Sequence, residues 1–305
     1  MLIGAHVSTA GGLAQAHARG VETESDAIQI FNQSPRMWRP VVYRDEDIAE
    51  FRQLMADGPI ESVVIHAVYL INCASDEPEI RSKSLASLIH ALRLGDAIGA
   101  DGVVIHPGAL KGKPLEEGLR LAGDAFGEAL AESDGCPLLL ENTAGAGGTL
   151  GRSFAELHAL IDNAGGDERL GICLDSCHMF ASGFEVRTAG ALSEVVDEGA
   201  EVVGLDRLKC LHVNDSKVGL GSNRDRHAAF AGGELGRDGL ATFLSEPRFD
   251  GLPALIETGS TGKAPDTEAV RLAKELREKG LAARGGRGGR KKRPRASAAG
   301  RRSRG

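Results

Sequence analysis

The chain has 305 residues, of which 42% are hydrophobic and 26% are charged, so it is long and apolar enough to bury a sizeable core. It has no run of about 18 apolar residues and no basic-then-apolar leader, so we expect neither a transmembrane helix nor a secretory signal. The net charge of −7 hides an asymmetry: ten Lys or Arg and no acid lie between Arg284 and Gly305, which leaves 26 basic and 43 acidic residues, a net of −17, in the rest.

Eight short apolar runs, rich in Ile, Leu and Val, recur along the chain. Fully apolar runs of this length are typical of strands that are buried on both faces of a parallel sheet. The predicted strands are Leu2–Val7, Ala27–Phe31, Ser62–Ala67, Gly102–Pro107, Pro137–Thr143, Leu170–Asp175, Leu208–Asn214 and Pro253–Thr258.

Segments with helical periodicity lie between these runs. The alternation predicts parallel strands joined by crossover helices. A doubly wound sheet fits the alternation as well, but eight units within about 280 residues favour a (β/α)8 TIM barrel over residues 1–280. The predicted helices are Ser82–Gly99, Leu115–Ala131, Phe154–Ile161, Leu240–Leu244 and Thr267–Lys279.

The C-terminal segment, residues 281–305, has a different composition. From Ala283 onward it contains no aliphatic residue larger than alanine and is dominated by Gly, Arg and Lys. A segment that buries so little apolar surface does not offset its ordering entropy, so we predict a disordered basic tail. Its charge, opposite to that of the body, indicates contacts with nucleic-acid phosphates, with a solubilising role as the alternative.

Metal-binding side chains follow the predicted strands. Six strands in succession, from the third to the eighth, end in His, Asp or Glu. In a barrel these ends lie on one rim, where catalytic residues converge. The candidates are His66, His106, Glu141, Asp175, His178, His212 and Glu257, together with Asp225 and His227 in the loop after the seventh strand.

The residue types of this set indicate a metal. Imidazole and carboxylate groups without thiolates suit zinc. Nine candidates exceed the needs of one tetrahedral ion, so we expect two or three ions, particularly if a carboxylate bridges. Clustered divalent ions suit hydrolysis at phosphorus, because they activate the attacking water and stabilise the leaving oxygen.

Several motifs resemble a known family. These are IGAHVSTAGGL, VYLIN, IHPGA, ENTAGAGG, CLDSCHMFASGF, LHVNDSK, DRH and the IET of the eighth strand. In order and spacing they resemble the endonuclease IV family of apurinic/apyrimidinic endonucleases, xylose-isomerase-like TIM barrels, from Leu2 to about Lys279. DSCH followed by HVNDSK and DRH is the most specific part. The resemblance implies a deoxyribonuclease IV (phage-T4-induced type), which hydrolyses the phosphodiester 5′ to an abasic site during base excision repair and leaves a 3′-hydroxyl.

The resemblance also implies a trinuclear zinc site. In it Glu141 bridges two ions, and Glu141 and Glu257 are the implied catalytic residues beside a bridging hydroxide as nucleophile. The implied ligand sets are His66, His106 and Glu141; then Asp175, His212 and Glu257; and finally His178, Asp225 and His227.

Four further residues are predicted to contact DNA. The resemblance matches Arg36, in SPRMW, and Tyr69 and Leu70, in VYLIN, to residues that enter the minor groove. Wedges of this kind unstack and kink a duplex. Arg226, between two candidate ligands, is predicted to contact a phosphate, with a plain surface charge as the alternative.

Two positions depart from the family pattern. Ala231 stands where the first glycine of a G-x-G loop is usual, and Met37 follows Arg36 where a polar residue is common. These departures concern the shape of one loop and the contacts in the groove, but none of the candidate ligands.

Two other functions stay open from the sequence. One is a metal-dependent sugar isomerase or epimerase on the same kind of barrel, and the other is a non-enzymatic DNA-binding protein with structural zinc. The five cysteines have no framework spacing, so we expect free thiols and a cytoplasmic, nucleoid-associated protein. We expect it to act as a monomer on double-stranded DNA that contains abasic sites.

Overall fold

Eight parallel strands close into a barrel in the computed structural model, which describes residues 1–288, with side chains described as far as Gly285. The strands pair in chain order, and β8 returns to pair with β1. The predicted (β/α)8 TIM barrel is therefore confirmed. The strands are β1 Leu2–His6, β2 Ala27–Phe31, β3 Ser62–His66, β4 Gly102–Ile105, β5 Leu138–Glu141, β6 Leu170–Asp175, β7 Leu208–His212 and β8 Pro253–Ile256.

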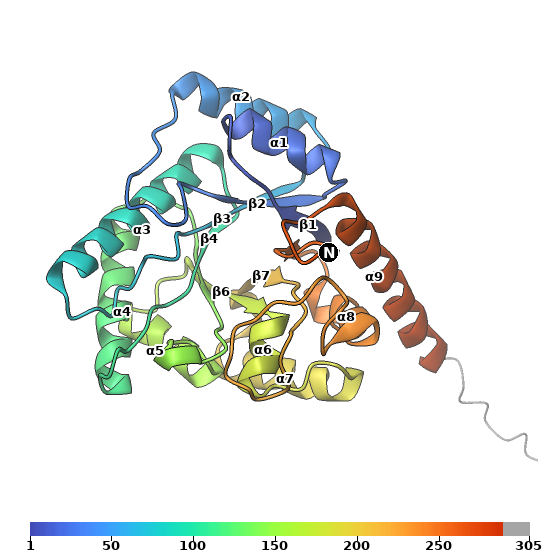
Figure 1. Cartoon of the computed structure of the whole chain (residues 1–305). Helices are drawn as coiled ribbons and strands as arrows, with labels where there is room; N and C mark the ends of the chain where they lie inside the picture. The colour runs from blue at the N-terminus through green and yellow to red at the C-terminus, as the bar shows by residue number, and fades with distance from the viewer. Residues whose placement is uncertain (289–305) are drawn as a thin grey trace, which may run out of the picture.

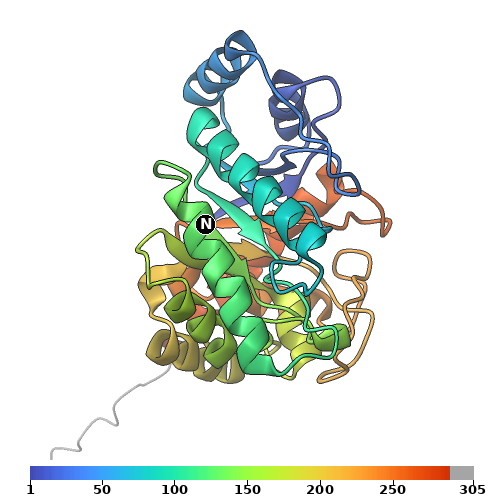
Figure 2. The same cartoon turned by 90° about the vertical axis from the view of Figure 1, so that its left-hand side faces the viewer.

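The helices surround the strands (Figure 1), and α3 and α4 cover one side of the barrel (Figure 2). None of the helices within residues 1–288 is both long and apolar enough to cross a membrane. The helices are α1 Leu13–Glu22, α2 Asp45–Asp57, α3 Pro78–Ile98, α4 Leu115–Ala131, α5 Phe154–Asn163, α6 Ser176–Ser182, α7 Ala189–Val202, α8 Gly236–Leu244 and α9 Thr267–Gly288.

The core has two parts because side chains alternate along each strand. One set points outward and packs against the helices in a large cluster that includes Phe51, Phe126 and Phe243. The other set fills the inside of the barrel with one buried residue from each strand from β2 to β8. This inner apolar layer consists of Ala27, Val64, Val104, Leu139, Cys173, Cys210 and Leu255.

Helix α9 extends past the predicted end of the barrel domain at residue 280. It continues to Gly288, and the Arg284 guanidinium holds this extension to α8. Arg284 donates a hydrogen bond of 3.1 Å to Ser245 Oγ and lies 3.2 Å from a carboxylate oxygen of Glu246. Residues 281–285 are therefore helical where a disordered tail was expected, and 289–305 lie outside the described residues.

Candidate metal centre

The candidate ligands form a second layer inside the barrel, directly above the apolar one. A residue two positions further along a strand points to the same side, so each inner apolar residue predicts an inward side chain two residues later. Six of the seven positions found in this way carry His, Asp or Glu, and the seventh, on β2, carries Gln29. The six are His66, His106, Glu141, Asp175, His212 and Glu257.

Glu141 lies at the centre of this layer and is fully buried. Its Oε2 atom is 3.4 Å from His66 Nε2 and 3.0 Å from His106 Nε2. Its Oε1 atom is 3.1 Å from His178 Nδ1 and 3.1 Å from His212 Nδ1. Burial raises the pKa of Glu141, but the attraction of His106 and His212 outweighs burial and holds this pKa well below its usual range. An ionised carboxylate therefore joins the two halves of the site.

An amide fixes the two carboxylates that flank this centre. Asn214 Nδ2 donates to Asp175 Oδ2 at 2.6 Å and to Glu257 Oε2 at 3.0 Å. Burial raises the pKa of Glu257, but the attraction of His212 outweighs burial, and the pKa falls to about 2. Both carboxylates are thus held by a neutral donor, which leaves their negative charge available to a cation.

A loop brings two more ligands to the edge of the site. Asp225 Oδ2 lies 3.3 Å from Nε2 of His178, at the start of α6, and Asp225 Oδ1 lies 3.4 Å from His227 Nε2. The buried carboxylate of Asp215 holds the base of this loop by accepting backbone N–H groups from its far end, including that of Leu235 at 2.9 Å. The i, i+2 pair therefore faces one point, as its spacing predicted.

The buried polar atoms of the site fit bound cations. Three of them, Glu141 Oε2, His178 Nε2 and His227 Nε2, have no hydrogen-bond partner although they are shielded from water. Polar atoms that are buried without a partner are destabilising. Divalent cations bound at these positions would satisfy all three atoms. The groups whose ligand atoms lie within 4.8 Å of one another include His66, His106 and Glu141; His66, His212 and Glu257; and His178, Asp225 and His227.

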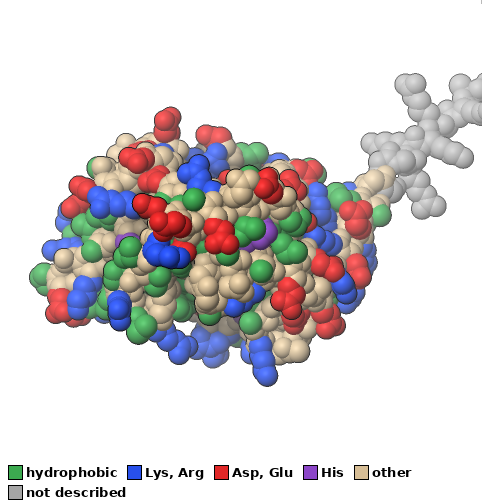
Figure 3. All heavy atoms as spheres, turned by 90° about the horizontal axis from the view of Figure 1, so that it is seen from above, with side chains coloured by type: hydrophobic (Ala, Val, Ile, Leu, Met, Phe, Trp, Pro, Cys, Tyr) green, Lys and Arg blue, Asp and Glu red, His purple; other side chains and the backbone are tan. Residues whose placement is uncertain are grey.

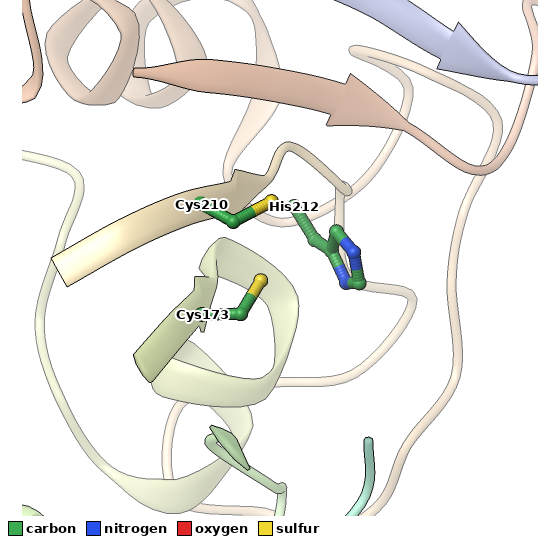
Figure 4. A group of neighbouring side chains, drawn as sticks. All are labelled: Cys173, Cys210 and His212. Atoms are coloured by element: carbon green, nitrogen blue, oxygen red, sulfur yellow. The ribbon is translucent and has the colours of Figure 1, made fainter. Parts of the chain in front are cut away.

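Two thiols lie beneath the ligand layer, next to His212. Cys173 on β6 and Cys210 on β7 direct their sulfur atoms into the same space (Figure 4), within 4.8 Å of a ring nitrogen of His212. Burial raises the pKa of the Cys173 thiol well above its usual range, and its hydrogen bond with Cys210 adds to this. Both side chains belong to the inner apolar layer of the barrel. All five cysteines are free and buried, as expected.

Comparison with known proteins identifies the family. A family described as a xylose isomerase-like TIM barrel matches residues 17–279. The probable endonuclease 4 of Geotalea daltonii is 39% identical over 258 residues, which cover 84% of this chain and 90% of that protein. The probable endonuclease 4 of Halothermothrix orenii is 38% identical over 274 residues, which cover 89% and 99%. The chain belongs to the endonuclease IV family.

Solved structures agree with this assignment. The crystal structure of endonuclease IV from Thermus thermophilus matches with a TM-score of 0.79 and 36% identity, over 92% of this chain and all of that one. A D-tagatose 3-epimerase-like protein and an L-ribulose 3-epimerase match with TM-scores of 0.70 and 0.66 at 20% and 15% identity. These two show only that epimerases share the barrel with the endonuclease IV family.

In this endonuclease IV family member, a cleft of about 820 Å³ lies beside the candidate metal centre, with Glu257 in its wall. Tyr69 is 56% exposed, and its ring centroid is 5.1 Å from that of His66. It lines the cleft together with Phe31, Pro35 and Glu257. Only Tyr69 of the four predicted contacts therefore touches both the cleft and a candidate ligand.

The other three predicted contacts lie nearby or at the surface. Arg36 is exposed and follows Pro35 of the cleft wall. Leu70 is half-buried next to Tyr69, and Arg226 is exposed between the two loop ligands. Residues 1–285 give Arg226 no carboxylate partner within ion-pair distance, which leaves its guanidinium open to a phosphate.

Two amide residues of the site escaped the sequence prediction. Gln29 contacts His212 and Glu257, and Asn214 contacts Asp175 and Glu257. Asn214 stands two residues after a predicted ligand in HVNDSK, and Gln29 is the only polar residue of the AIQIF strand. A polar residue at an inward-facing strand position was the available signal for Gln29.

The backbone at Ala231 is strained. Its φ of 61° lies in the left-handed region, which is unfavourable by about 1–2 kcal/mol for a residue with a Cβ atom. Ala231→Gly is therefore expected to raise the free energy of unfolding by about 1 kcal/mol, because part of the relief is offset by the freedom of glycine in the unfolded chain. Urea unfolding measures this change. Ala49→Gly, in the exposed middle of α2, is the control and should lower the free energy of unfolding by about 1 kcal/mol. Equal losses of stability in the two variants would contradict backbone strain at Ala231.

Proposed function

We propose that this chain is a zinc-dependent endonuclease of DNA repair that hydrolyses the phosphodiester 5′ to abasic sites and leaves a 3′-hydroxyl. The observation that carries the proposal is the convergence of nine imidazole and carboxylate groups, six from the ligand layer and three from α6 and the loop after β7, with Glu141 between four imidazoles. The names of the relatives, probable endonuclease 4, support the same reaction.

Three zinc ions would occupy the centre. Glu141 would be shared between two of them, because its two oxygens face different imidazoles. When bound, the ions would supply an activated water and stabilise charge on the phosphate and the leaving oxygen. The proposed sets are His66 and His106 with Glu141; Asp175, His212 and Glu257 with Glu141; and His178, Asp225 and His227.

The protein residues themselves would bind and orient the DNA and would exclude bulk water from the site. The ionised Glu141 and Glu257 would act as the catalytic carboxylates, since their low pKa values keep them charged at neutral pH. The exposed ring of Tyr69, which lines the cleft, would press against unstacked DNA. A nucleotide that has lost its base leaves the duplex at a smaller energetic cost than an intact one, which favours the abasic site.

An incision assay tests the proposal against its main rival, a sugar epimerase. The zinc-loaded protein is incubated with a duplex that carries one abasic analogue, with the undamaged duplex and with a ketohexose. We expect cutting of the abasic duplex alone. Interconversion of the sugar without incision would favour the epimerase, and tight DNA binding without incision would favour a non-enzymatic protein.

Metal content gives the first prediction from this centre. We expect about three metal ions per chain, mainly zinc, because nine ligands supply three sets. Elemental analysis of active, purified protein measures the number. One ion or none in fully active protein would contradict the trinuclear centre. Brief chelator treatment should leave much of the activity, since ions held by several buried ligands leave slowly.

The charge of the body makes the basic C-terminal segment a candidate for DNA attraction. Acidic and basic side chains are interspersed on the face drawn in Figure 3, and neither sign covers it. The chain upstream of Arg284 carries a net −17, from 26 basic and 43 acidic residues. Arg284 itself is paired with Glu246, so the cations that follow it, most of them beyond Gly288, are the candidates for contacts with phosphates. There the sequence has eight Lys or Arg and no acid.

Truncation after Gly288 is expected to weaken the salt dependence of DNA binding. Each phosphate neutralised steepens the slope of log K against log salt by about 0.9, so loss of four contacts flattens the slope by roughly 3 to 4. Titration of undamaged duplex at several salt concentrations measures the slope. The metal content and the rate of single-turnover cleavage at saturating enzyme should stay unchanged. An unchanged slope would assign the segment a solubilising role.

Size exclusion with and without DNA tests the monomer that we propose for this nucleoid-associated cytoplasmic enzyme.

A further inference from the structure

Gln29 occupies the one inward-facing position of the ligand layer on β2 to β8 that carries no metal-binding group. Its side chain is fully buried. Gln29 Oε1 lies 2.8 Å from His212 Nε2, and Gln29 Nε2 lies 2.9 Å from Glu257 Oε1. The amide nitrogen is also 3.1 Å from His6 Nδ1. One amide thus joins β2 to two candidate ligands and to β1.

The direction of these hydrogen bonds follows from their chemistry. A carboxylate oxygen only accepts, so the amide group that faces Glu257 must be the NH2. The amide oxygen then faces His212, and because it only accepts, His212 Nε2 must carry a hydrogen. An imidazole that binds a metal is neutral and has one such hydrogen, which leaves the lone pair on Nδ1 for the metal. This Nδ1 atom lies 3.1 Å from the central carboxylate of Glu141, on the inner side of the site.

We propose that Gln29 is a positioning residue of the metal centre: it holds His212 as the tautomer that presents Nδ1 to the metal, and it orients the carboxylate of Glu257 toward the same ion. The proposal rests on the metal centre of the proposed function. Outer partners that hold the second nitrogen of a ligating histidine fix the ring and strengthen the ligand. Gln29 serves an imidazole and a carboxylate of one proposed ion with the two ends of its amide.

The contacts of Gln29 predict a local effect. His212 and Glu257 belong to one proposed ion, whereas His106 and His227 belong to the other two. Because Gln29 contacts neither His106 nor His227 within hydrogen-bond distance among residues 1–285, its loss should weaken one ion selectively. If Gln29 acted in packing alone, its replacement would instead lower thermal stability and weaken the binding of all ions equally.

Gln29→Met tests this, since methionine keeps the length of the side chain and removes both hydrogen-bonding ends. Zinc release from the zinc-loaded protein to a colorimetric chelator is followed across chelator concentrations. We expect one zinc equivalent to bind about 10- to 100-fold more weakly, with the other two unchanged. Gln53→Met, on α2 with a hydrogen bond only to Asp57, is the control and should release zinc like the parent. Unchanged release from Gln29→Met, or equal weakening of all equivalents, would overturn the proposal.

A second measurement needs no variant. Nitrogen NMR of the zinc-loaded parent, labelled at histidine, shows which ring nitrogen of His212 carries the hydrogen. We expect a protonated, slowly exchanging Nε2 and an Nδ1 bound to metal. A protonated Nδ1 would overturn the proposal even if Gln29→Met failed to fold. Neither readout uses DNA, so absence of incision in the parent would contradict the proposed function while the zinc and NMR data still decide the role of Gln29.

Discussion

Glu141→Gln is expected to lower turnover on abasic DNA by about 10³-fold or more. Removal of a single donor at a developing charge typically slows an enzyme by about 10²–10³-fold, and Glu141 faces four imidazoles, so it serves more than one part of the site. The amide keeps the shape but removes the charge that two ions would share. Affinity for the abasic duplex should change by no more than a few fold, because the cleft and Tyr69 are untouched. Single-turnover cleavage and equilibrium binding measure the two quantities separately.

Glu79→Gln provides the matched control for this substitution. Glu79 is exposed on α3 and pairs only with Lys83, so its amide variant should cleave at the parental rate. Glu257→Gln should resemble Glu141→Gln. A Glu141→Gln protein that turns over at nearly the parental rate would remove this carboxylate from the mechanism. A simultaneous loss of zinc and of DNA binding would show that its role is to hold the site together rather than to act in turnover.

Tyr69→Ala and Arg36→Ala are expected to weaken binding to abasic duplex by about 10- to 100-fold. Stacking of a base on an aromatic side chain contributes about 1–3 kcal/mol, and 1.4 kcal/mol corresponds to a factor of ten. Binding to undamaged duplex should weaken much less, because a side chain that presses into the groove acts on distorted DNA. Fluorescence anisotropy with both duplexes measures the ratio of the two losses.

Two variants separate shape from charge in that experiment. Tyr69→Phe keeps the exposed ring and should bind abasic duplex within a few fold of the parent. Arg93→Ala removes an exposed arginine that pairs with Glu132 and does not line the cleft, so it should leave both affinities unchanged. Equal losses on the abasic and the undamaged duplex would make Arg36 and Tyr69 simple backbone contacts.

The barrel was predictable because its strands are buried on both faces. β2, β6 and α4 have the bounds that the sequence indicated, since each is an uninterrupted apolar or amphipathic run. Helices α1, α2, α6 and α7 were not predicted. Two of them bury few large residues: α2 buries only Phe51, and the buried face of α1 consists mostly of small or polar side chains.

The candidate ligands at the strand ends could be proposed from the sequence because each follows an apolar run, and the alternation of side chains then directs them inward. His178, Asp225 and His227 lie instead on α6 and in the loop after β7. The amide side chains that hydrogen-bond to these ligands were not predictable from the sequence. Gln29 becomes visible only when the inward register of β2 is known, and Asn214 only when β7 and β8 are seen to pair. The end of α9 was placed too early, because the tertiary contacts of Arg284 with Ser245 and Glu246 outweigh the glycines that follow it.

The most direct test of the central claim is to map the cut in a duplex that carries one abasic analogue. Zinc-loaded protein is incubated with the duplex labelled at either end, and the products are sized and offered to a DNA polymerase. The account predicts a single cut on the 5′ side of the abasic site, with a 3′-hydroxyl that the polymerase extends without further treatment. The same cut should disappear after exhaustive chelation and return with zinc. A cut on the 3′ side, an end that is not extended, or incision that is indifferent to metal would contradict it.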